Sequence, residues 1–157
     1  MAGKNIPDLY PGITAHIVSK DAQAHVDLLG QLFGAEIMGG QRNEEGKWWY
    51  CELRINEGRF MVSDEFPELG FLSPDTVGGT PVMLHVYVDD VDATHQQMLD
   101  AGGTSLMAPA DRYWGDRSGQ VRDSFGHMWT VSTRKETLKN DEIVRRGDEE
   151  VKRLSHA

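Results

Sequence analysis

Two nine-residue segments, HIVSKDAQA at 16–24 and HVYVDDVDA at 85–93, share one pattern 69 residues apart. Each begins with a histidine followed by alternating residues, as a half-buried strand does. Each then reaches an aspartate at its sixth position, where the carboxylate can cap a following helix. The same offset pairs Gly34 with Gly103 without an insertion. The pattern therefore predicts an internal repeat.

Each copy of the repeat predicts a strand, a helix and three further strands. In the first copy we expect a helix that Gly34 ends, a bend or bulge at 38–40, and strands over 13–19, 48–55 and 59–63. In the second copy we expect a helix over 92–101 and strands over 82–88, 104–107, 120–123 and 127–133.

This order predicts an α+β fold in which two βαβββ modules form a cupped mixed sheet with helices outside, followed by a C-terminal helix. The boundaries that we expect are a first module at 8–65, a linker at 66–80, a second module at 81–134 and a helical tail at 135–157.

Composition narrows the classes of partner. The chain has 157 residues and a formal net charge of −9, which disfavours binding to nucleic acid or to anionic membrane surfaces. It shows neither a signal-peptide core at its start nor an apolar run long enough for a membrane span. Cys51 is the single cysteine, so no intrachain disulfide can form. We expect a cytoplasmic protein without nucleic-acid or membrane partners.

Three stretches carry a family resemblance: LFGAE at 32–36, the segment at 85–93, and WGDRSGQVRDSFGH at 114–127. With the repeat, they resemble the vicinal oxygen chelate superfamily of glyoxalases, bleomycin-resistance proteins and extradiol dioxygenases, over residues 8–134. The likeness is greatest to its 3-demethylubiquinone-methyltransferase-like, glyoxalase-related subgroup. Ser124 stands where this family usually has a proline.

The resemblance implies where a metal would be held, because metal-using relatives take one ligand from the first and last strand of each copy. Aligned on the two aspartates, these positions are Thr14, Met61, Met83 and Thr130. A shift by two residues keeps the same face and gives His16, Ser63, His85 and Ser132. Neither set provides the three His or carboxylate ligands that catalytic zinc usually takes. We therefore expect no metal cofactor, with a divalent ion held by His16 and His85 as the alternative.

The other histidines and the aromatic residues suggest positions within each module. His25 and His95 fall on the helices, where we expect them to be solvated, and His127 falls in a turn. Of Trp48 and Trp49, at least one should face the cup and the other should pack under a helix. Further expectations are that Trp129 lies in the core, that Tyr113 and Trp114 lie at the rim, that Cys51 is a buried thiol, and that the charges of 111–117 pair and hold a hairpin.

These features favour a metal-free small-molecule-binding protein of the glyoxalase and bleomycin-resistance type that sequesters a medium-sized organic ligand. We expect the ligand to contact Thr14, His16, Trp48, Met61, Ser63, Met83, His85, Tyr87, Trp114 and Thr130. No catalytic residue is assigned. One alternative is a metal-dependent lyase, isomerase or dioxygenase that uses His16 and His85. The other is a structural protein whose side chains fill the cup.

The tail predicts the state of assembly. Residues 140–154 have a helical pattern with four apolar residues, Ile143, Val144, Val151 and Leu154. A helix of this length is marginal in water unless one face is packed. Since relatives also pair their chains, we expect a homodimer, with the tail packed at its interface or on its own subunit.

Overall fold

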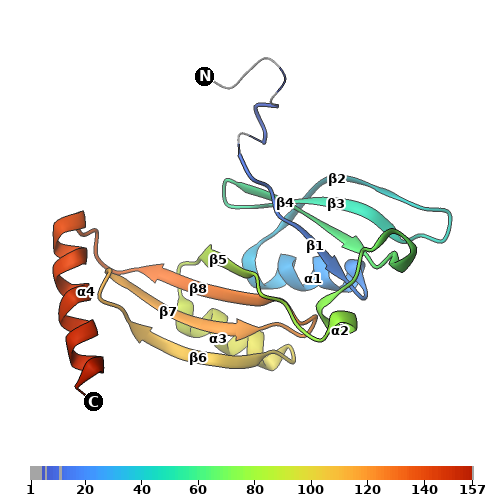
Figure 1. Cartoon of the computed structure of the whole chain (residues 1–157). Helices are drawn as coiled ribbons and strands as arrows, with labels where there is room; N and C mark the ends of the chain where they lie inside the picture. Colours follow the sequence, from blue (N-terminus) through green and yellow to red (C-terminus); the bar gives the residue numbers. More distant parts are fainter. Residues whose placement is uncertain (1–4, 6, 11, 157) are drawn as a thin grey trace. The chain divides into compact units, whose positions relative to one another are not determined.

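A computed structural model describes residues 5, 7–10 and 12–156. The chain divides after Thr80 into two compact units. Each unit contains one four-stranded mixed sheet, and Figure 1 shows the elements in chain order. The α+β class and the repeated βαβββ order are thereby confirmed. Whether the two sheets form one cup depends on how the units sit together and stays a prediction.

The first unit contains a sheet in the strand order β1-β4-β3-β2, with β1 and β4 parallel. Its elements are β1 (His16–Ser19), α1 (Ala22–Phe33), β2 (Glu36–Arg42), β3 (Trp48–Ile55) and β4 (Gly58–Asp64). Val26 and Leu29 of α1 and Cys51 and Leu53 of β3 are buried, because α1 packs on the sheet. Two short helices follow, η1 (Pro67–Leu69) and α2 (Pro74–Val77), in the segment expected to be a linker.

Local sequence sets both ends of α1. The Asp21 carboxylate accepts a hydrogen bond of 2.9 Å from the backbone N–H of Ala24, as a helix cap does. Gly34 ends the helix with φ of +64°, a left-handed conformation that favours glycine. The predicted bulge at 38–40 is also present, since the register of β2 shifts between Ile37 and Gly39.

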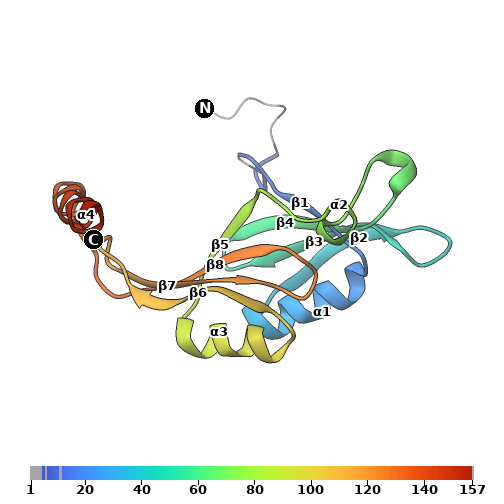
Figure 2. The same cartoon turned by 60° about the horizontal axis from the view of Figure 1, so that its bottom comes forward.

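The second unit repeats this arrangement in the strand order β5-β8-β7-β6, with β5 and β8 parallel. Its elements are β5 (Met83–Tyr87), α3 (Val91–Asp100), β6 (Thr104–Asp111), β7 (Asp116–Arg122), β8 (Met128–Arg134) and α4 (Asn140–Ser155). Asp90 caps α3 through the N–H of Ala93, as Asp21 caps α1. Figure 2 shows α3 along one face of the β6–β7–β8 sheet, which leaves the other face of this sheet without a helix of the repeat.

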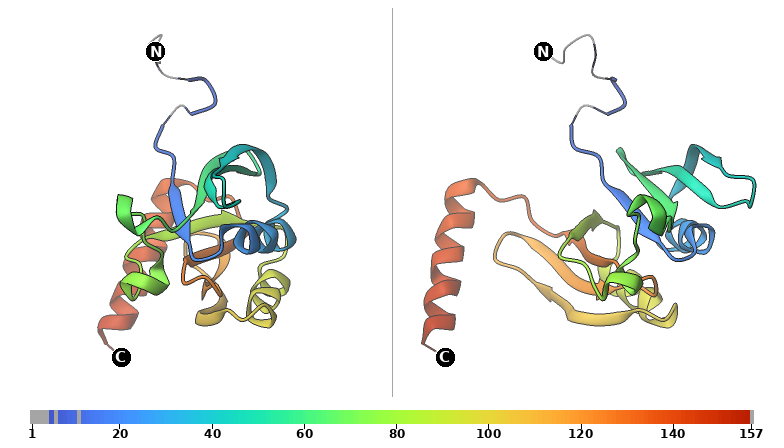
Figure 3. Two further views of the ribbon diagram at one scale, coloured as in Figure 1. Left: turned by 90° about the vertical axis from the view of Figure 1, so that its right-hand side faces the viewer. Right: turned by 45° about the vertical axis from the view of Figure 1, so that its right-hand side comes forward.

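The helix α4 lies at the end of this sheet where β6 turns into β7 (Figure 3). Gly147 faces Tyr113 of that turn so closely that a Cβ atom at this position would lie 3.1 Å from the ring. Acidic residues occupy the first turn of α4 and basic residues its last turn, which suits the helix dipole. Among the described residues, none of the helices has the length and apolar composition that crossing a bilayer takes.

Two expectations about helical histidines are wrong. His25 and His95 are buried rather than solvated. His25 shares a hydrogen bond with the hydroxyl of Ser19 at 2.5 Å, and His95 shares one with Ser105 at 3.1 Å. A serine of a neighbouring strand thus satisfies each ring, which lets the ring lie between its helix and the sheet.

The remaining core expectations hold. Trp129 is buried, and its indole N–H donates to Asp123 at 2.8 Å. The same carboxylate accepts from the backbone N–H groups of Phe125 and His127, so it holds the turn in which His127 lies. Cys51 is a buried free thiol, and burial raises its pKa to about 11.

Candidate functional site

The face of the second sheet opposite α3 carries a row of polar side chains. In the strand register His85 of β5 lies beside Thr130 of β8, which lies beside Gln120 of β7. Because side chains alternate along strands, the neighbouring residues Val86, Val131 and Val121 point the other way and are buried. We call the face that carries His85, Thr130 and Gln120 the open face.

Asp116 anchors a hydrogen-bonded network at one end of the open face. Its carboxylate accepts from the hydroxyl of Tyr87 at 2.7 Å and from the indole N–H of Trp114 at 3.1 Å, and it forms an ion pair with Arg134. The Asp116 side chain is only 1% exposed, whereas that of Arg134 is 50% exposed. Hydrogen bonds to Tyr87 and Asp116 raise the pKa of Arg134. The network holds Tyr87 and Trp114 in fixed orientations.

His85 is bound into the same face. It shares a hydrogen bond of 2.8 Å with Ser132, and its ring stacks on Tyr87 with the centroids 5.0 Å apart. One ring nitrogen of His85 is therefore engaged by a hydroxyl. This arrangement suits a side chain that lines a ligand site, because its neighbours fix the orientation of the ring.

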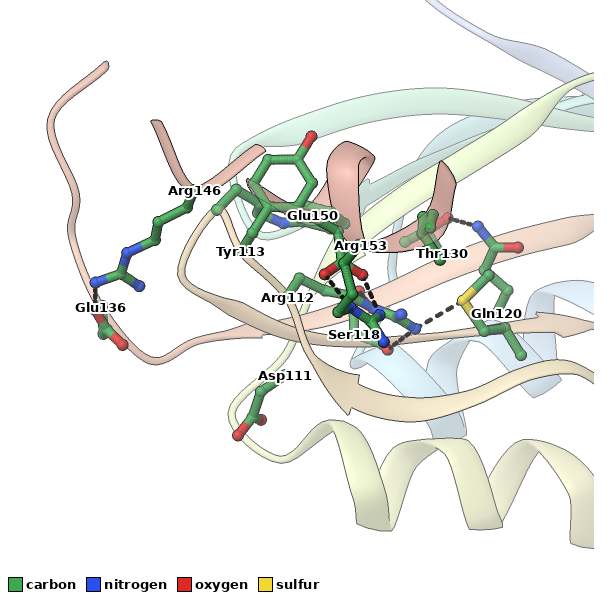
Figure 4. A pocket seen from close by; sticks show the side chains of 13 residues that line it. Asp111, Arg112, Tyr113, Ser118, Gln120, Thr130, Glu136, Arg146, Glu150 and Arg153 are labelled. Carbon is green, nitrogen blue, oxygen red and sulfur yellow. Dashed lines mark hydrogen bonds and ion pairs between the residues drawn. The ribbon is translucent and has the colours of Figure 1, made fainter. Parts of the chain in front are cut away.

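A pocket of about 630 Å³ opens between the β6–β7 turn and α4 (Figure 4). The sheet and the turn contribute Met107, Asp111, Arg112, Tyr113, Trp114, Ser118, Gln120 and Thr130, and the tail contributes Glu136, Arg146, Glu150, Arg153 and Leu154. The rings of Tyr113 and Trp114 meet edge to face, with centroids 4.9 Å apart. Gln120 donates to Thr130 at 3.5 Å on the floor of the pocket.

Of the ten residues expected to contact a ligand, Trp114 and Thr130 line this pocket. Met83, His85 and Tyr87 belong to the open face of the same sheet. The remaining five lie in the first unit and are Thr14, His16, Trp48, Met61 and Ser63. These residues belong to two different units, and their meeting around one ligand stays a prediction.

In the first unit, His16 contacts the edge of Phe71 with the centroids 5.7 Å apart. Partial desolvation lowers the pKa of His16, although much of its side chain remains exposed. The indole N–H of Trp48 donates to Gln23 of α1 at 3.1 Å, so Trp48 lies toward the helix. Trp49, left without a partner by a register shift in β2, stacks on Phe66 at 4.2 Å.

The side chains at the expected metal positions do not fit a divalent ion. The register places His16 opposite Met61 and His85 opposite Thr130, so each strand pair offers one imidazole and no carboxylate at these positions. Thioether and hydroxyl groups are poor ligands for zinc or manganese. Across the described part of the chain, no three His, Cys, Asp or Glu side chains gather as a metal site would require.

Arg112, Ser118 and Gln120 line the pocket, although the sequence did not indicate them as site residues. The charges of 111–117 were expected to pair and hold a hairpin, and Arg117 does pair with Asp111 at 3.1 Å. Asp116 pairs instead with Arg134 of the next strand. Arg112 therefore has no ion pair with Asp116 and lines the pocket. The charge count of the segment could not reveal this, because the partner of Asp116 lies outside it.

Comparisons with known proteins agree with this architecture. The sequence model of the Glyoxalase/Bleomycin resistance protein/Dioxygenase superfamily matches residues 13–131. An uncharacterised protein of Mycobacterium bovis is 38% identical over 136 residues, which covers 85% of this chain and 90% of that protein. An uncharacterised protein of Mycobacterium tuberculosis shows the same identity over the same length, with 80% of its own chain covered.

Three solved structures are similar. TioX from Micromonospora sp. ML1 is 24% identical with a TM-score of 0.59, covering 82% of this chain and 99% of its own. A putative 3-demethylubiquinone-9 3-methyltransferase, the PhnB protein of Bacillus cereus, has a TM-score of 0.62 at 18% identity, covering 77% and 98%. FosX of Listeria monocytogenes, in complex with Mn(II) and sulfate, has a TM-score of 0.60 at 13% identity, covering 85% and 97%. At these identities the likeness shows the fold alone.

Proposed function

The chain belongs to the glyoxalase/bleomycin resistance protein/dioxygenase superfamily, and we propose that it is a metal-free binding protein for a medium-sized organic molecule. The ligand occupies the pocket between the β6–β7 turn and α4, with the open face as its floor. The cytoplasmic location stays a prediction from the sequence.

The pocket in the second unit carries this proposal. Its volume of about 630 Å³ lies in the range of small-molecule sites, roughly 300–1,000 Å³. It combines the rings of Tyr113 and Trp114 and the flexible thioether of Met107 with polar and charged side chains that can orient an organic ligand. The Asp116 network holds Trp114 in place before a ligand arrives, which lowers the entropic cost of binding.

Ligand screening tests the proposal. We expect members of a library of antibiotics, quinones and aromatic metabolites to raise the melting temperature in proportion to the logarithm of their concentration. The same compounds should quench tryptophan fluorescence, because Trp114 lines the pocket. Trp114→Phe should remove most of this quenching, whereas the matched variant Trp49→Phe in the first unit should retain it. Quenching that survives Trp114→Phe and disappears with Trp49→Phe would place the ligand elsewhere.

A metal-dependent enzyme is the competing hypothesis, and elemental analysis distinguishes it from a metal-free binding protein. Protein purified without a chelator should contain no stoichiometric zinc, nickel, iron or manganese. A stoichiometric metal that is lost on His85→Ala would overturn the binding-protein proposal. His25→Ala is the matched control, because His25 is engaged by Ser19 beneath α1 in the first unit, whereas His85 belongs to the second.

For the assembly, we propose that a second copy of the chain packs on α4. Val144 and Val151, one above the other on the helix, are 62% and 63% exposed. In an antiparallel alignment centred between Gly147 and Asp148, Val144 of one helix lies opposite Val151 of the other.

A further inference from the structure

The charged side chains that line the pocket pair unevenly. Each of its three carboxylates has a cationic partner: Asp111 pairs with Arg117 at 3.1 Å, Glu136 with Arg146 at 3.2 Å and Glu150 with Arg153 at 2.6 Å. Arg112 also lines the pocket but has no carboxylate partner among the described residues. Of the three arginines that line the pocket, Arg112 is therefore the one without a carboxylate contact among the described residues, although the lining contains three acidic and three basic side chains.

The Arg112 guanidinium is held in place by neutral acceptors. Its Nε donates to the Ser118 hydroxyl at 3.2 Å, and its Nη2 donates to the Ser118 carbonyl at 3.0 Å and contacts the sulfur of Met107 at 2.7 Å (Figure 4). In the part of the chain that the structure describes, Nη1 has no acceptor. An arginine has five N–H donors in a planar fork, so an oriented pair of donors remains for a ligand.

We infer that the ligand of this pocket is an organic acid, with one anionic group on Arg112 and an aromatic or apolar body against Tyr113 and Trp114. This inference rests on the proposed function and names its ligand class. A partly buried cation without a counter-ion is costly, and an oxyanion would both neutralise it and accept from the free donors.

The body of the ligand follows from the neighbouring side chains. The indole N–H of Trp114 is already satisfied by Asp116, so the ring offers its apolar surface. Tyr113 stands at a right angle to it, with an interplanar angle of 89°. Two rings in this arrangement form a corner that a flat hydrocarbon framework can fill by stacking on one ring and meeting the edge of the other.

Matched probes of one shape and different charge test the inference. We would titrate the protein with 2-naphthoate, with its neutral analogue 2-naphthamide and with the cation 2-naphthylmethylammonium, following binding by calorimetry at fixed ionic strength. A charge-assisted contact to Arg112 should make naphthoate bind about tenfold or more tightly than the amide. This preference should shrink as salt is added, because salt screens partly exposed charges.

Variants assign the preference to Arg112. Arg112→Gln should abolish it, and Arg112→Lys should retain part of it. Arg145→Gln is the matched control, because it removes the same charge from a residue of α4 that does not line the pocket. Glu150→Gln should strengthen naphthoate binding, since it releases Arg153.

The outcomes separate two failures. If naphthamide binds as tightly as naphthoate, or if Arg112→Gln leaves the preference unchanged in protein that still unfolds cooperatively, the ligand class is wrong while the binding function stands. If none of the three probes binds, the proposed function of this pocket and the inference both fail.

Discussion

Tyr87 on β5 donates a hydrogen bond of 2.7 Å to Asp116 on β7, across the full width of β8. This bond joins two strands that are not neighbours in the sheet. It ends on a buried carboxylate that also binds Trp114 and Arg134. The orientation of Trp114 in the pocket thus depends on Tyr87 of β5, which is an edge strand of the sheet.

The first prediction concerns this network. Tyr87→Phe should lower the free energy of unfolding by about 1 kcal/mol, and Asp116→Asn by about 2 kcal/mol, because the latter weakens the acceptor for three donors. The half-exposed Arg134 can regain water, which limits the loss. Urea unfolding measures both values. In the double variant the combined loss should fall short of the sum, and losses that simply add would show that the two residues are not coupled.

The second prediction concerns the turn at Asp123–Gly126, which is closed by a bond of 3.1 Å from the Gly126 N–H to the Asp123 carbonyl. Ser124 occupies the position in which a proline is favoured, and no hydrogen bond from its N–H is among those of the described residues. Ser124→Pro should raise the free energy of unfolding by about 0.5–1 kcal/mol by restricting the unfolded chain. Ser124→Ala should leave it nearly unchanged, and a loss with proline would refute the turn geometry.

The third prediction concerns Cys51. Burial raises the pKa of its thiol from 9.0 to about 11, so the native state keeps the proton more firmly than the unfolded state. The stability that this provides is complete below pH 9 and is lost as the pH rises toward about 11. Unfolding of the native protein and of Cys51→Ala, compared over this range, should isolate the effect. At pH 8 a disulfide reagent should label Cys51 slowly in native protein and rapidly in urea, and equal rates would contradict the burial.

The fourth prediction concerns assembly through α4. The full chain should have the mass of a dimer in light scattering at micromolar concentration, and a chain that ends at Leu138 should have the mass of a monomer. Val144→Ser with Val151→Ser should weaken association by removing the apolar stripe. Val77→Ser is a control of similar exposure on another helix, 58% against 62% for Val144. A full-length monomer, or equal association of the truncated chain, would remove α4 from the interface.

Periodicity within short segments made most of the fold predictable. The strand over Trp48–Ile55 has the bounds expected from its sequence, and the caps at Asp21 and Asp90 lie where the repeat placed them. These features depend on residues a few positions apart, so the local sequence is sufficient to predict them. The first strand is shorter than expected, since β1 begins at His16 and not at residue 13.

The burial of His25 and His95 was not predictable in the same way. A histidine on a helix is ordinarily assigned to solvent, and its burial requires a partner that satisfies the ring. The partners are Ser19 and Ser105, each on a strand beside the helix. The sequence contains both serines but does not indicate that either would meet an imidazole.

The sequence by itself determined the repeat, the strands and helices, the family likeness and the poor metal-ligand set, because each depends on residue types at regular spacings. Only the tertiary structure decided which charges are paired. Asp116 is the immediate neighbour of Arg117 in the chain, yet its carboxylate binds Arg134 of β8, and Arg117 turns to Asp92 of α3. Arg112 therefore forms no ion pair with Asp116 and lines the pocket instead. Ion pairing depends on distance in space, and strand register and helix packing bring these groups together.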